Sequence, residues 1–524
     1  MLHLHMTSPS RFSRLFVAVL VLGCVAGTAA QDTKLGKLTK PAKFAQDKQD
    51  KKLSKLAPLA PMQAATITEA SIRGHMEFLA GDAMQGRGSG TADEWRAAAY
   101  IGSQMRRWGI EPLGDDGGYV KTVDTGRITA AAAPLLVVNG MALTHGREIL
   151  VQSINKGAVS GPLYRYVPGA TAPEGAFVFV PDGATVDNAA IAKAAAVLTV
   201  ETTQIRATWA ATGSRMPAGG AAAGGRGGGA PAPATVRIVL DKATHAAMAG
   251  VADGTKLDFQ CATQPGRTYN ALGQLKGSDP ALAAQVILLT AHLDHLGVRA
   301  GAADPIFNGA DDDASGSTAV LELAQAIAIG PRPKRTVMFA WFGSEESGGF
   351  GARDFLEHPL VAKDKIVANL EFEMIGRSDP MVADKTLWLT GYERSNLGVE
   401  LAKQGARLVQ DPHPEQNFFS RSDNIQLARA GVIAHTVSSF NLHKDYHQAS
   451  DEVKTIDFGH MTMAIQSMYA PVMWLTNSAF VPTWYENCQP VAGAPRGGGP
   501  GAAAGASAAP TPPPCKANGK DPIK

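Results

Sequence analysis

Short apolar runs alternate with helical patterns over residues 286–476, and this alternation constrains the fold more than any other feature of the chain. The apolar runs, which we expect to be strands, are Val286–Ala291, Thr336–Phe342, Ile366–Phe372, Thr386–Thr390 and Val432–Val437. The helical patterns are Ala314–Ile329, Gly349–Glu357, Asn396–Gly405 and Ile456–Thr476. Strands that alternate with helices favour an α/β fold with a mostly parallel central sheet flanked by helices.

The first of these runs ends in a histidine and a carboxylate. His292 and Asp294 are two residues apart, so along a strand they point to the same side, and Asp294 can hydrogen-bond the imidazole as the outer carboxylate of a metal site does. Three aspartates, Asp311–Asp313, then precede the helical pattern that begins near Ala314. One aspartate suffices to cap a helix, so three of them beside His-x-Asp indicate a cation. The alternative is a buried histidine next to an acidic cap.

Two glutamates and a histidine follow the later strands. Glu345 and Glu346 come just after the second predicted strand, where one could bind a metal and the other accept a proton. Glu373 follows the third strand, and His447 lies in a polar loop before the last helical pattern. Each of them alone also fits an exposed surface residue. Because ligands bind at the carboxyl ends of the strands in an open α/β sheet, these residues together predict one site.

The expected ligands of this site are histidines and carboxylates without thiolates. This set suits zinc, with manganese or cobalt as alternatives, and does not suit the oxygen-only sites of calcium or magnesium. Charge counting favours two divalent ions, because three carboxylates and one bridging hydroxide balance the charge of two such ions. We therefore expect two zinc ions per chain.

The first 30 residues have the pattern of a secretory signal. Arg11 and Arg14 precede the apolar stretch Leu15–Val25, which is short for a membrane span, and Thr28-Ala29-Ala30 offers a cleavage site. A competing interpretation is a bacterial lipoprotein signal in which Cys24 would be lipidated. Either interpretation predicts a secreted or periplasmic protein without a membrane-spanning helix.

The boundaries of the linker, the insert, the main domain and the tail are predicted from changes in composition along the chain. Residues 31–65 are rich in Lys, Gln and Asp and predict a flexible linker, and the Gly/Ala/Pro-rich residues 481–524 predict a disordered tail. Residues 131–260 contain short apolar runs between Gly/Pro turns, so we expect a β-rich insert there. Residues 66–130 and 261–480 would then form the main domain around it.

Charge and cysteine content narrow the possible partners. The formal net charge of the 524 residues is +2, which gives no indication of nucleic acid binding. Four cysteines do not make a disulfide framework. Cys488 and Cys515 could pair in an oxidising compartment, which would leave Cys261 free.

Five ordered motifs resemble the secreted co-catalytic di-zinc aminopeptidases, a group that also includes aminopeptidase Y and glutamate carboxypeptidase II. The motifs are AHLDHLG, NGADDDASG, FAWFGSEESGGFGARDFL, NLEFEMIGR and DYHQASD. The resemblance implies a zinc-exopeptidase fold, which is phosphorylase/hydrolase-like, and peptide substrates. Because the family often carries a protease-associated domain before the first metal motif, the resemblance also implies that residues 131–260 form such a domain.

The resemblance further implies a role for each site residue. It assigns the zinc ions to two histidines and three carboxylates: His292, Asp312, Glu346, Glu373 and His447. Asp312 would bridge both ions, and Asp294 would orient His292. Glu373 stands where the family usually has aspartate, so its side chain is one methylene longer. Glu345 would be the general base that acts through a metal-bridging hydroxide, and Tyr446 would donate a hydrogen bond to the oxyanion.

Other functions fit part of the same pattern. A single-zinc glutaminyl cyclase shares this fold, but the bridging Asp312 together with both histidines argues against it. A carboxypeptidase is possible, since the longer Glu373 could mark a changed specificity. A binding protein on an inactive scaffold should have lost ligands, and this chain has a candidate for each. Arg421 and Asp423 could line the substrate pocket or form a buried ion pair.

Overall fold

The computed structural model describes residues 66–155, 157–213, 216–219, 235–299, 302–490 and 515. The predicted signal, Cys24, the linker over residues 31–65 and most of the predicted tail lie outside these residues. The described chain folds around two large β-sheets, one of ten strands and one of eight. Within the described residues, no helix is both long and apolar enough to cross a membrane.

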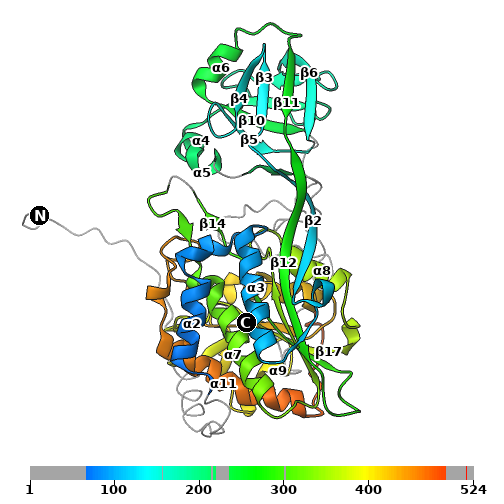
Figure 1. Cartoon of the computed structure of the whole chain (residues 1–524), viewed down its shortest axis with the longest axis vertical. Coiled ribbons are helices and arrows are strands. Elements are labelled where there is room, and N and C mark those ends of the chain that lie inside the picture. The colour runs from blue at the N-terminus through cyan, green and yellow to red at the C-terminus, as the bar shows by residue number, and fades with distance from the viewer. Residues whose placement is uncertain are drawn as a thin grey trace, which may run out of the picture. The chain divides into compact units, whose positions relative to one another are not determined.

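The ten-stranded sheet contains the strands that the sequence predicts, and its centre is parallel. Figure 1 labels three of its strands, β2 (Val120–Ala130), β12 (Thr263–Leu275) and β17 (Ile366–Phe372). Neighbouring strands in the centre are β20 (Ala434–Ser438), β17 (Ile366–Phe372), β13 (Val286–His292) and β16 (Thr336–Phe342). Their carboxyl ends therefore meet at one edge, which is where the candidate residues were expected. Every residue of β13, β16 and β17 is buried, as is usual for a parallel strand covered on both faces.

The outer strands differ from the prediction of a mostly parallel sheet. β12 (Thr263–Leu275) pairs antiparallel with β16 and with β2 (Val120–Ala130), and β18 (Leu387–Leu389) is antiparallel to β20. The sheet as a whole is mixed. Its remaining strands are β1 (Glu111–Pro112), β9 (Ala218–Gly219) and β19 (Leu408–Gln410). β12 escaped prediction because its first half is largely exposed and interrupted by Pro265 and Gly266.

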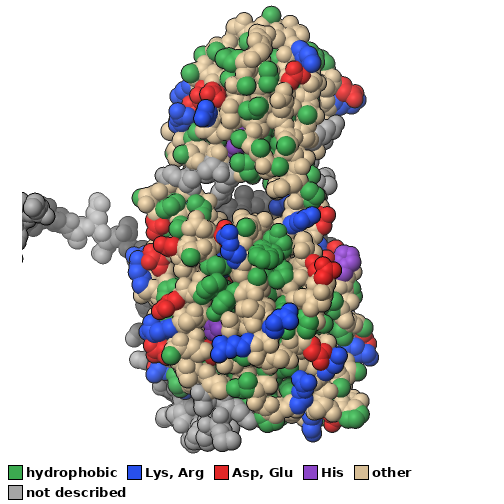
Figure 2. Space-filling model, in the orientation of Figure 1, with side chains coloured by type: hydrophobic (Ala, Val, Ile, Leu, Met, Phe, Trp, Pro, Cys, Tyr) green, Lys and Arg blue, Asp and Glu red, His purple; other side chains and the backbone are tan. Residues whose placement is uncertain are grey.

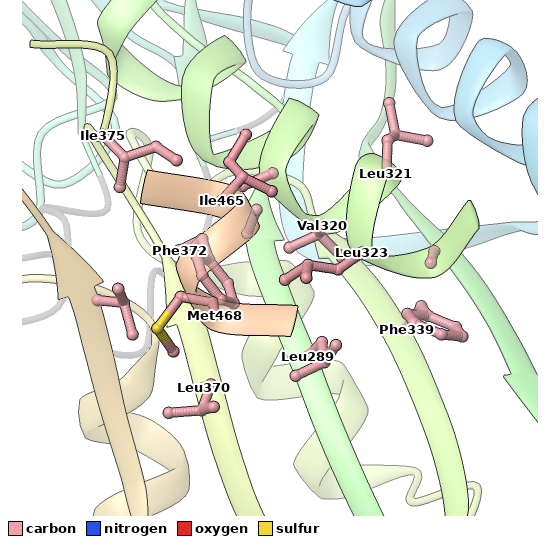
Figure 3. Close-up of a cluster of buried hydrophobic side chains, with 14 of the residues drawn as sticks. Leu289, Val320, Leu321, Leu323, Phe339, Leu370, Phe372, Ile375, Ile465 and Met468 are labelled. Atoms are coloured by element: carbon pink, nitrogen blue, oxygen red, sulfur yellow. The ribbon is translucent and has the colours of Figure 1, made fainter. Parts of the chain in front are cut away.

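Helices cover both faces of this sheet. On one face, Leu289 of β13 and Phe372 of β17 pack with Val320 and Met468 from two helices, and this cluster is completely buried (Figure 3). On the other face, Leu288 joins a second buried cluster, because successive side chains of a strand point to opposite faces. The helices are α2 (Glu69–Leu79), α3 (Ala92–Arg107), α7 (Gly316–Ile329), α8 (Phe350–Glu357), α9 (Leu397–Lys403), α10 (Asn424–Arg429) and α11 (Phe458–Asn477).

The eight-stranded sheet is built from residues 135–260. Its strands are β3 (Leu135–Val138), β4 (Met141–Thr144), β5 (Ile149–Ser153), β6 (Ala158–Arg165), β7 (Phe177–Phe179), β8 (Ala196–Val200), β10 (Val236–Leu240) and β11 (Lys256–Gln260). It has its own buried apolar cluster, which includes Leu136, Phe177 and Phe259. Three short helices accompany it: α4 (Thr203–Ala207), α5 (Trp209–Gly213) and α6 (Lys242–Met248).

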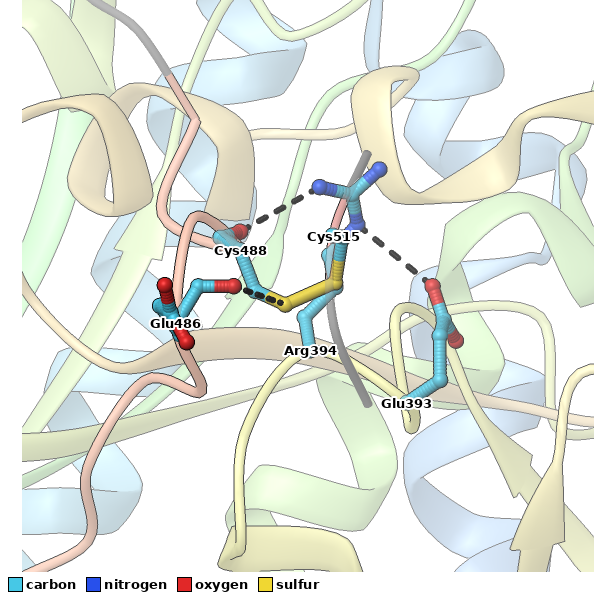
Figure 4. Close-up of a disulfide and its surroundings, with 5 residues drawn as sticks. All are labelled: Glu393, Arg394, Glu486, Cys488 and Cys515. Atoms are coloured by element: carbon cyan, nitrogen blue, oxygen red, sulfur yellow. Dashed lines mark hydrogen bonds and ion pairs between the residues drawn. A yellow bond between two sulfur atoms is a disulfide. The ribbon is translucent and has the colours of Figure 1, made fainter. Parts of the chain in front are cut away.

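Two of the cysteines are joined. Cys488 and Cys515 form a disulfide with a Cα–Cα distance of 4.5 Å, and Arg394 donates a hydrogen bond to the carbonyl oxygen of Cys488 (Figure 4). Cys261 is buried and is not in a disulfide. The pairing that the sequence left open is therefore present in the structure.

The charged side chains are dispersed. On the face shown in Figure 2, Lys and Arg side chains alternate with Asp and Glu side chains and gather into no region of one sign. This agrees with the small net charge of +2.

Candidate metal centre

The candidate residues lie together at the carboxyl edge of the parallel strands. His292 is the last residue of β13, Glu373 directly follows β17, and Glu345 and Glu346 follow β16. His447 comes from the loop after β20. Asp312 belongs to the helical turn η4 (Ala310–Ser315), which leads into α7.

Asp312 lies at the centre of this group because each of its carboxylate oxygens faces a different histidine. Its Oδ1 is 3.2 Å from His292 Nε2, and its Oδ2 is 3.1 Å from His447 Nε2. On the His292 side, Glu373 Oε1 lies 4.0 Å from the same imidazole nitrogen. On the His447 side, Glu346 Oε1 lies 2.9 Å from the imidazole nitrogen. The structure thus contains two groups of ligand atoms that share one carboxylate.

The spacing and chemistry of both groups fit a bound metal ion. Two ligands of a tetrahedral zinc ion, each about 2.1 Å from the metal, are about 3.4 Å apart, and the distances above lie around this value. His292 is fully buried, and its Nε2 has no hydrogen-bond partner within the part of the chain that the structure describes. A buried nitrogen without a partner is costly in a metal-free protein, whereas a bound ion would satisfy it.

The charges of the centre favour a cation. Burial lowers the pKa of His447, but hydrogen bonds to Asp312 and Glu346 outweigh burial and raise this pKa to about 10. Burial and the charge of Asp312 raise the pKa of Glu346, but the neighbouring imidazoles of His295 and His447 outweigh them and lower it to about 2. These pKa shifts favour an ionised Glu346 beside a protonated His447 at neutral pH, which is an arrangement that attracts positive charge.

Asp294 has a different partner from the one that the sequence predicted. His292 Nδ1 lies 3.1 Å from the backbone carbonyl oxygen of Asp294 and 3.9 Å from its carboxylate Oδ1, so the carbonyl orients the imidazole. The Asp294 carboxylate instead accepts hydrogen bonds from the backbone N–H groups of Glu345 and Glu346, at 2.9 and 3.3 Å, and from the Ser89 hydroxyl. Asp294 thus fixes the loop that carries the two glutamates.

The two aspartates that flank Asp312 also hold backbone in place. Asp313 accepts hydrogen bonds from the N–H groups of His292 and Met374, and so ties the ends of β13 and β17 to η4. Asp311 accepts a hydrogen bond of 2.7 Å from the N–H of Gly376. The run of three aspartates therefore contains one metal-facing carboxylate and two that position it.

Asp451 positions the same turn from the opposite side. Its carboxylate accepts hydrogen bonds from the N–H groups of Asp311 and Asp312, and Arg377 holds it through an ion pair of 3.0 Å. This role could not be predicted from the sequence, because Asp451 lies far along the chain from the turn that it supports.

Glu345 and Tyr446 lie beside the metal-facing residues. Glu345 is only 1% exposed, and its charge contributes to raising the pKa of His292. The Tyr446 ring stacks on the His447 ring with a centroid distance of 3.9 Å. Glu345 thus directly precedes the metal-facing Glu346 in the chain, and Tyr446 contacts the metal-facing His447.

The two tentative pocket residues differ in their surroundings. The Arg421 guanidinium lies 5.9 Å from the centroid of the Tyr446 ring, next to the centre. Asp423 is fully buried, accepts a hydrogen bond from Gln426, and raises the pKa of the buried Glu371. Only Arg421 has the partly exposed position of a pocket residue.

The sequence analysis missed His295 as a member of the centre. Its Nδ1 lies 3.3 Å from Glu346 Oε1 and 3.7 Å from Asp312 Oδ2, so it faces the carboxylates that also face His447. Its place in the segment that carries His292 and Asp294 could have drawn notice to it.

Residues 270–470 match the model of a protein family described as Peptidase family M28. This segment is therefore similar to peptidase family M28. It contains the metal-facing residues from His292 to His447 and the central parallel strands of the ten-stranded sheet.

Several curated proteins are similar to parts of the chain. The leupeptin-inactivating enzyme 1 of Streptomyces exfoliatus is 36% identical over 132 residues, which are 25% of this chain and 28% of that protein. An aminopeptidase of Pseudomonas aeruginosa is 36% identical over 112 residues, or 21% of this chain and 18% of that protein. A probable lipoprotein aminopeptidase, LpqL, of Mycobacterium tuberculosis is 29% identical over 144 residues, 27% of each chain. The matched segments thus span less than a third of these relatives.

Among solved structures, a zinc aminopeptidase from Bacillus subtilis superimposes with a TM-score of 0.48 and 17% identity. The superposition covers 79% of this chain and 96% of that protein. An aminopeptidase from an Aneurinibacillus strain gives a TM-score of 0.46 with 17% identity, over 80% and 96% of the two chains.

Proposed function

We propose that this protein is a zinc-dependent aminopeptidase that removes N-terminal residues from peptides. The observation that carries the proposal is the position of Asp312, whose two oxygens face two separate histidine–carboxylate groups inside a segment similar to peptidase family M28. The names of the relatives from Streptomyces and Pseudomonas support a peptidase activity.

Each group would hold one zinc ion, with cobalt or manganese as substitutes. His292 and Glu373 would hold the first ion, His447 and Glu346 the second, and Asp312 would bridge them. When bound, such a pair of ions polarises a carbonyl group and lowers the pKa of water to near neutrality. Glu373 has the reach for its role, because its Oε1 already lies 4.0 Å from His292 Nε2.

Glu345 would act as the general base. The hydrogen bond of 2.9 Å from its N–H to Asp294 fixes its backbone, and its buried side chain has little access to bulk solvent. It would accept a proton from the attacking water and pass it to the amine that leaves. Tyr446, stacked on His447, would donate its hydroxyl proton in a hydrogen bond to the carbonyl oxygen as negative charge develops there.

The rest of the chain would serve this activity outside the cytoplasm. The disulfide between Cys488 and Cys515 supports export, since disulfides persist mainly in oxidising compartments. The lipoprotein named among the relatives agrees with either a secreted or a lipid-anchored protein. We further propose that residues 131–260 form a protease-associated domain inserted between residues 66–130 and 261–480. Arg421, beside Tyr446, would line the substrate pocket, whereas Asp423 would support the buried Glu371.

The Glu345→Gln variant tests the proposal because it removes the base and keeps the shape of the side chain. We expect a loss of about 10²–10⁴-fold in kcat on aminoacyl-nitroanilides, with two zinc ions per chain in both proteins. Glu357→Gln, an exposed change on α8, should behave as wild type.

Three other results of these measurements would each indicate a function other than an aminopeptidase. One zinc per chain with cyclisation of N-terminal glutamine would indicate a glutaminyl cyclase. Cleavage of N-blocked peptides at the C-terminus would indicate a carboxypeptidase. Absence of both metal and turnover would leave a binding protein.

A further inference from the structure

We propose that His295 is a fourth protein ligand of the second metal ion, together with Asp312, Glu346 and His447. The inference rests on the proposed function only in requiring that the centre binds zinc. It makes the two ions unequal, since the first would have three protein ligands and the second four.

The His295 ring points toward the carboxylates of Glu346 and Asp312. Its Nδ1 lies 3.3 Å from Glu346 Oε1 and 3.7 Å from Asp312 Oδ2. The same two oxygens lie 2.9 and 3.1 Å from His447 Nε2. The two rings are roughly perpendicular, with a centroid distance of 5.8 Å, so they approach the oxygens from different sides. Both imidazoles thus face the same two carboxylate oxygens, and His295, Asp312 and Glu346 offer ligand atoms that all lie within 4.8 Å of one another.

The ring nitrogens of His295 also lack hydrogen-bond partners within the described ranges of the chain. The residue is 1% exposed, and neither ring nitrogen has a hydrogen-bond partner among the residues that the structure describes. His435 shows how a buried histidine of this protein is ordinarily satisfied, because its two nitrogens lie 2.7 Å from Thr390 O and 2.7 Å from Ser395 Oγ. A buried polar group without a partner destabilises the fold, and a bond from Nδ1 to a metal would remove this cost for that nitrogen.

The surrounding backbone is shaped around this ring. Gly309 has a φ of +58°, and a Cβ at that position would lie 2.5 Å from the His295 ring. Arg87, which is buried, accepts a hydrogen bond from the N–H of His295 through its own carbonyl oxygen. The Arg87 side chain donates to the carbonyl oxygens of Leu293, Asn308 and Gly309. The strand end that carries His295 and the turn that carries Asp312 are therefore fixed to each other.

The consequence is that the second ion should be held more firmly than the first. Zinc sites with four protein ligands are typical of structural ions, whereas sites with three leave a position for water or substrate. The side chain of Glu373, at the first site, is 21% exposed, and that of His447 is 27% exposed. Because His295 is buried, the second ion should remain bound even when His447 is removed.

X-ray absorption at the zinc edge tests the proposal directly, because it counts imidazole ligands without any assay of activity. In the wild-type full-length protein loaded with two zinc ions, we expect three imidazoles shared between the ions. His295→Leu should show two, and its affinity for the second ion should fall by at least 10-fold. His447→Leu should keep that ion, and His358→Leu, an exposed control on the surface, should match wild type.

Three results would overturn the proposal that His295 is a metal ligand. Two imidazoles in the wild-type spectrum would overturn the proposal, even if His295→Leu failed to fold. An unchanged zinc affinity of a folded His295→Leu variant would overturn it as well, and so would a wild-type protein that binds no zinc. Three imidazoles in a protein without peptidase activity would support the role of His295 and count against the aminopeptidase function alone.

Discussion

Histidine and carboxylate side chains are buried together in two regions of this protein. One region is the metal centre at the edge of the ten-stranded sheet. The other lies between α2 and α7, where His75 Nε2 faces Glu322 Oε1 at 3.7 Å and His75 Nδ1 bonds the Tyr100 hydroxyl at 2.8 Å. His75 and Glu322 are buried, whereas the His447 side chain is 27% exposed, and the pKa values of His75 and His447 shift in opposite directions.

The difference lies in the carboxylates around each histidine. Between the helices, burial and then the charge of Arg107 lower the pKa of His75 to about 4, and burial raises the pKa of Glu322 to about 7. In the metal centre, the pKa of His447 rises to about 10 because two ionised carboxylates face it. Burial alone therefore removes charge from a histidine–glutamate pair, whereas several carboxylates around one imidazole hold a cation.

Removing one buried carboxylate from each region should separate these two situations most strongly. Asp312→Asn takes away the carboxylate shared by both ligand groups, so we expect loss of more than 10²-fold in zinc affinity at both sites, beyond what changes outside the ligand set usually cause. Glu322→Gln, the matched change between the helices, should bind zinc as wild type. Zinc titration of both variants measures this. Equal affinity of Asp312→Asn and wild type would show that the two groups do not share an ion-binding carboxylate.

The second prediction concerns the pH dependence of stability. With a pKa of about 7 in the folded protein and an ordinary value of 4.5, Glu322 keeps its proton in the folded state after the unfolded chain has lost it. Glu322 therefore lowers the free energy of unfolding as pH rises from 4.5 to 7. Glu322→Gln cannot lose a proton, so its stability relative to wild type should increase over this range by about 3 kcal/mol.

Urea unfolding at pH 4.5 and pH 7.5 measures this difference. In the variant, the lowered pKa of His75 remains and should make stability rise between pH 4 and 6.5, because the unfolded chain binds the proton that the folded state refuses. Parallel curves for the two proteins would mean that Glu322 is ionised in the folded state.

The sequence predicted the parts of the fold that depend on local pattern. β16 and β17 match the predicted ranges. β16 is apolar after its first residue, and β17 is apolar except at Asn369 and Glu371. β12 and β2 were missed because they alternate exposed and buried residues around proline and glycine and gain their pairing from distant partners. The extent of antiparallel pairing could not be inferred from composition.

Within the metal centre, too, residues marked by a local sequence pattern were predicted, whereas contacts between distant parts of the chain were not. The sequence pointed to His292, Asp312, Glu345, Glu346 and Glu373 because they lie at strand ends or at a helix start, and the family resemblance assigned a metal-binding role to His447, in a loop. The structure brings all six together. The partners of Asp294 and the role of Asp451 were not predicted, because a hydrogen bond from a carboxylate to a backbone N–H leaves no trace in residue type or spacing. Such contacts depend on how loops from several strands meet.

The smallest expected effect tests whether these backbone contacts matter for the ligands. Asp294→Asn keeps the size of the side chain but removes the negative charge that holds the N–H groups of Glu345 and Glu346. Residues that position ligands typically contribute 10–100-fold to metal affinity or activity, and we expect a loss in this range for the second ion. Ser89→Ala removes only the hydroxyl that donates to Asp294 and should cause less than about a 10-fold loss. If zinc titration showed that Asp294→Asn weakens the first ion but not the second, the carboxylate would act through His292, as the sequence first suggested, and not through the glutamate loop.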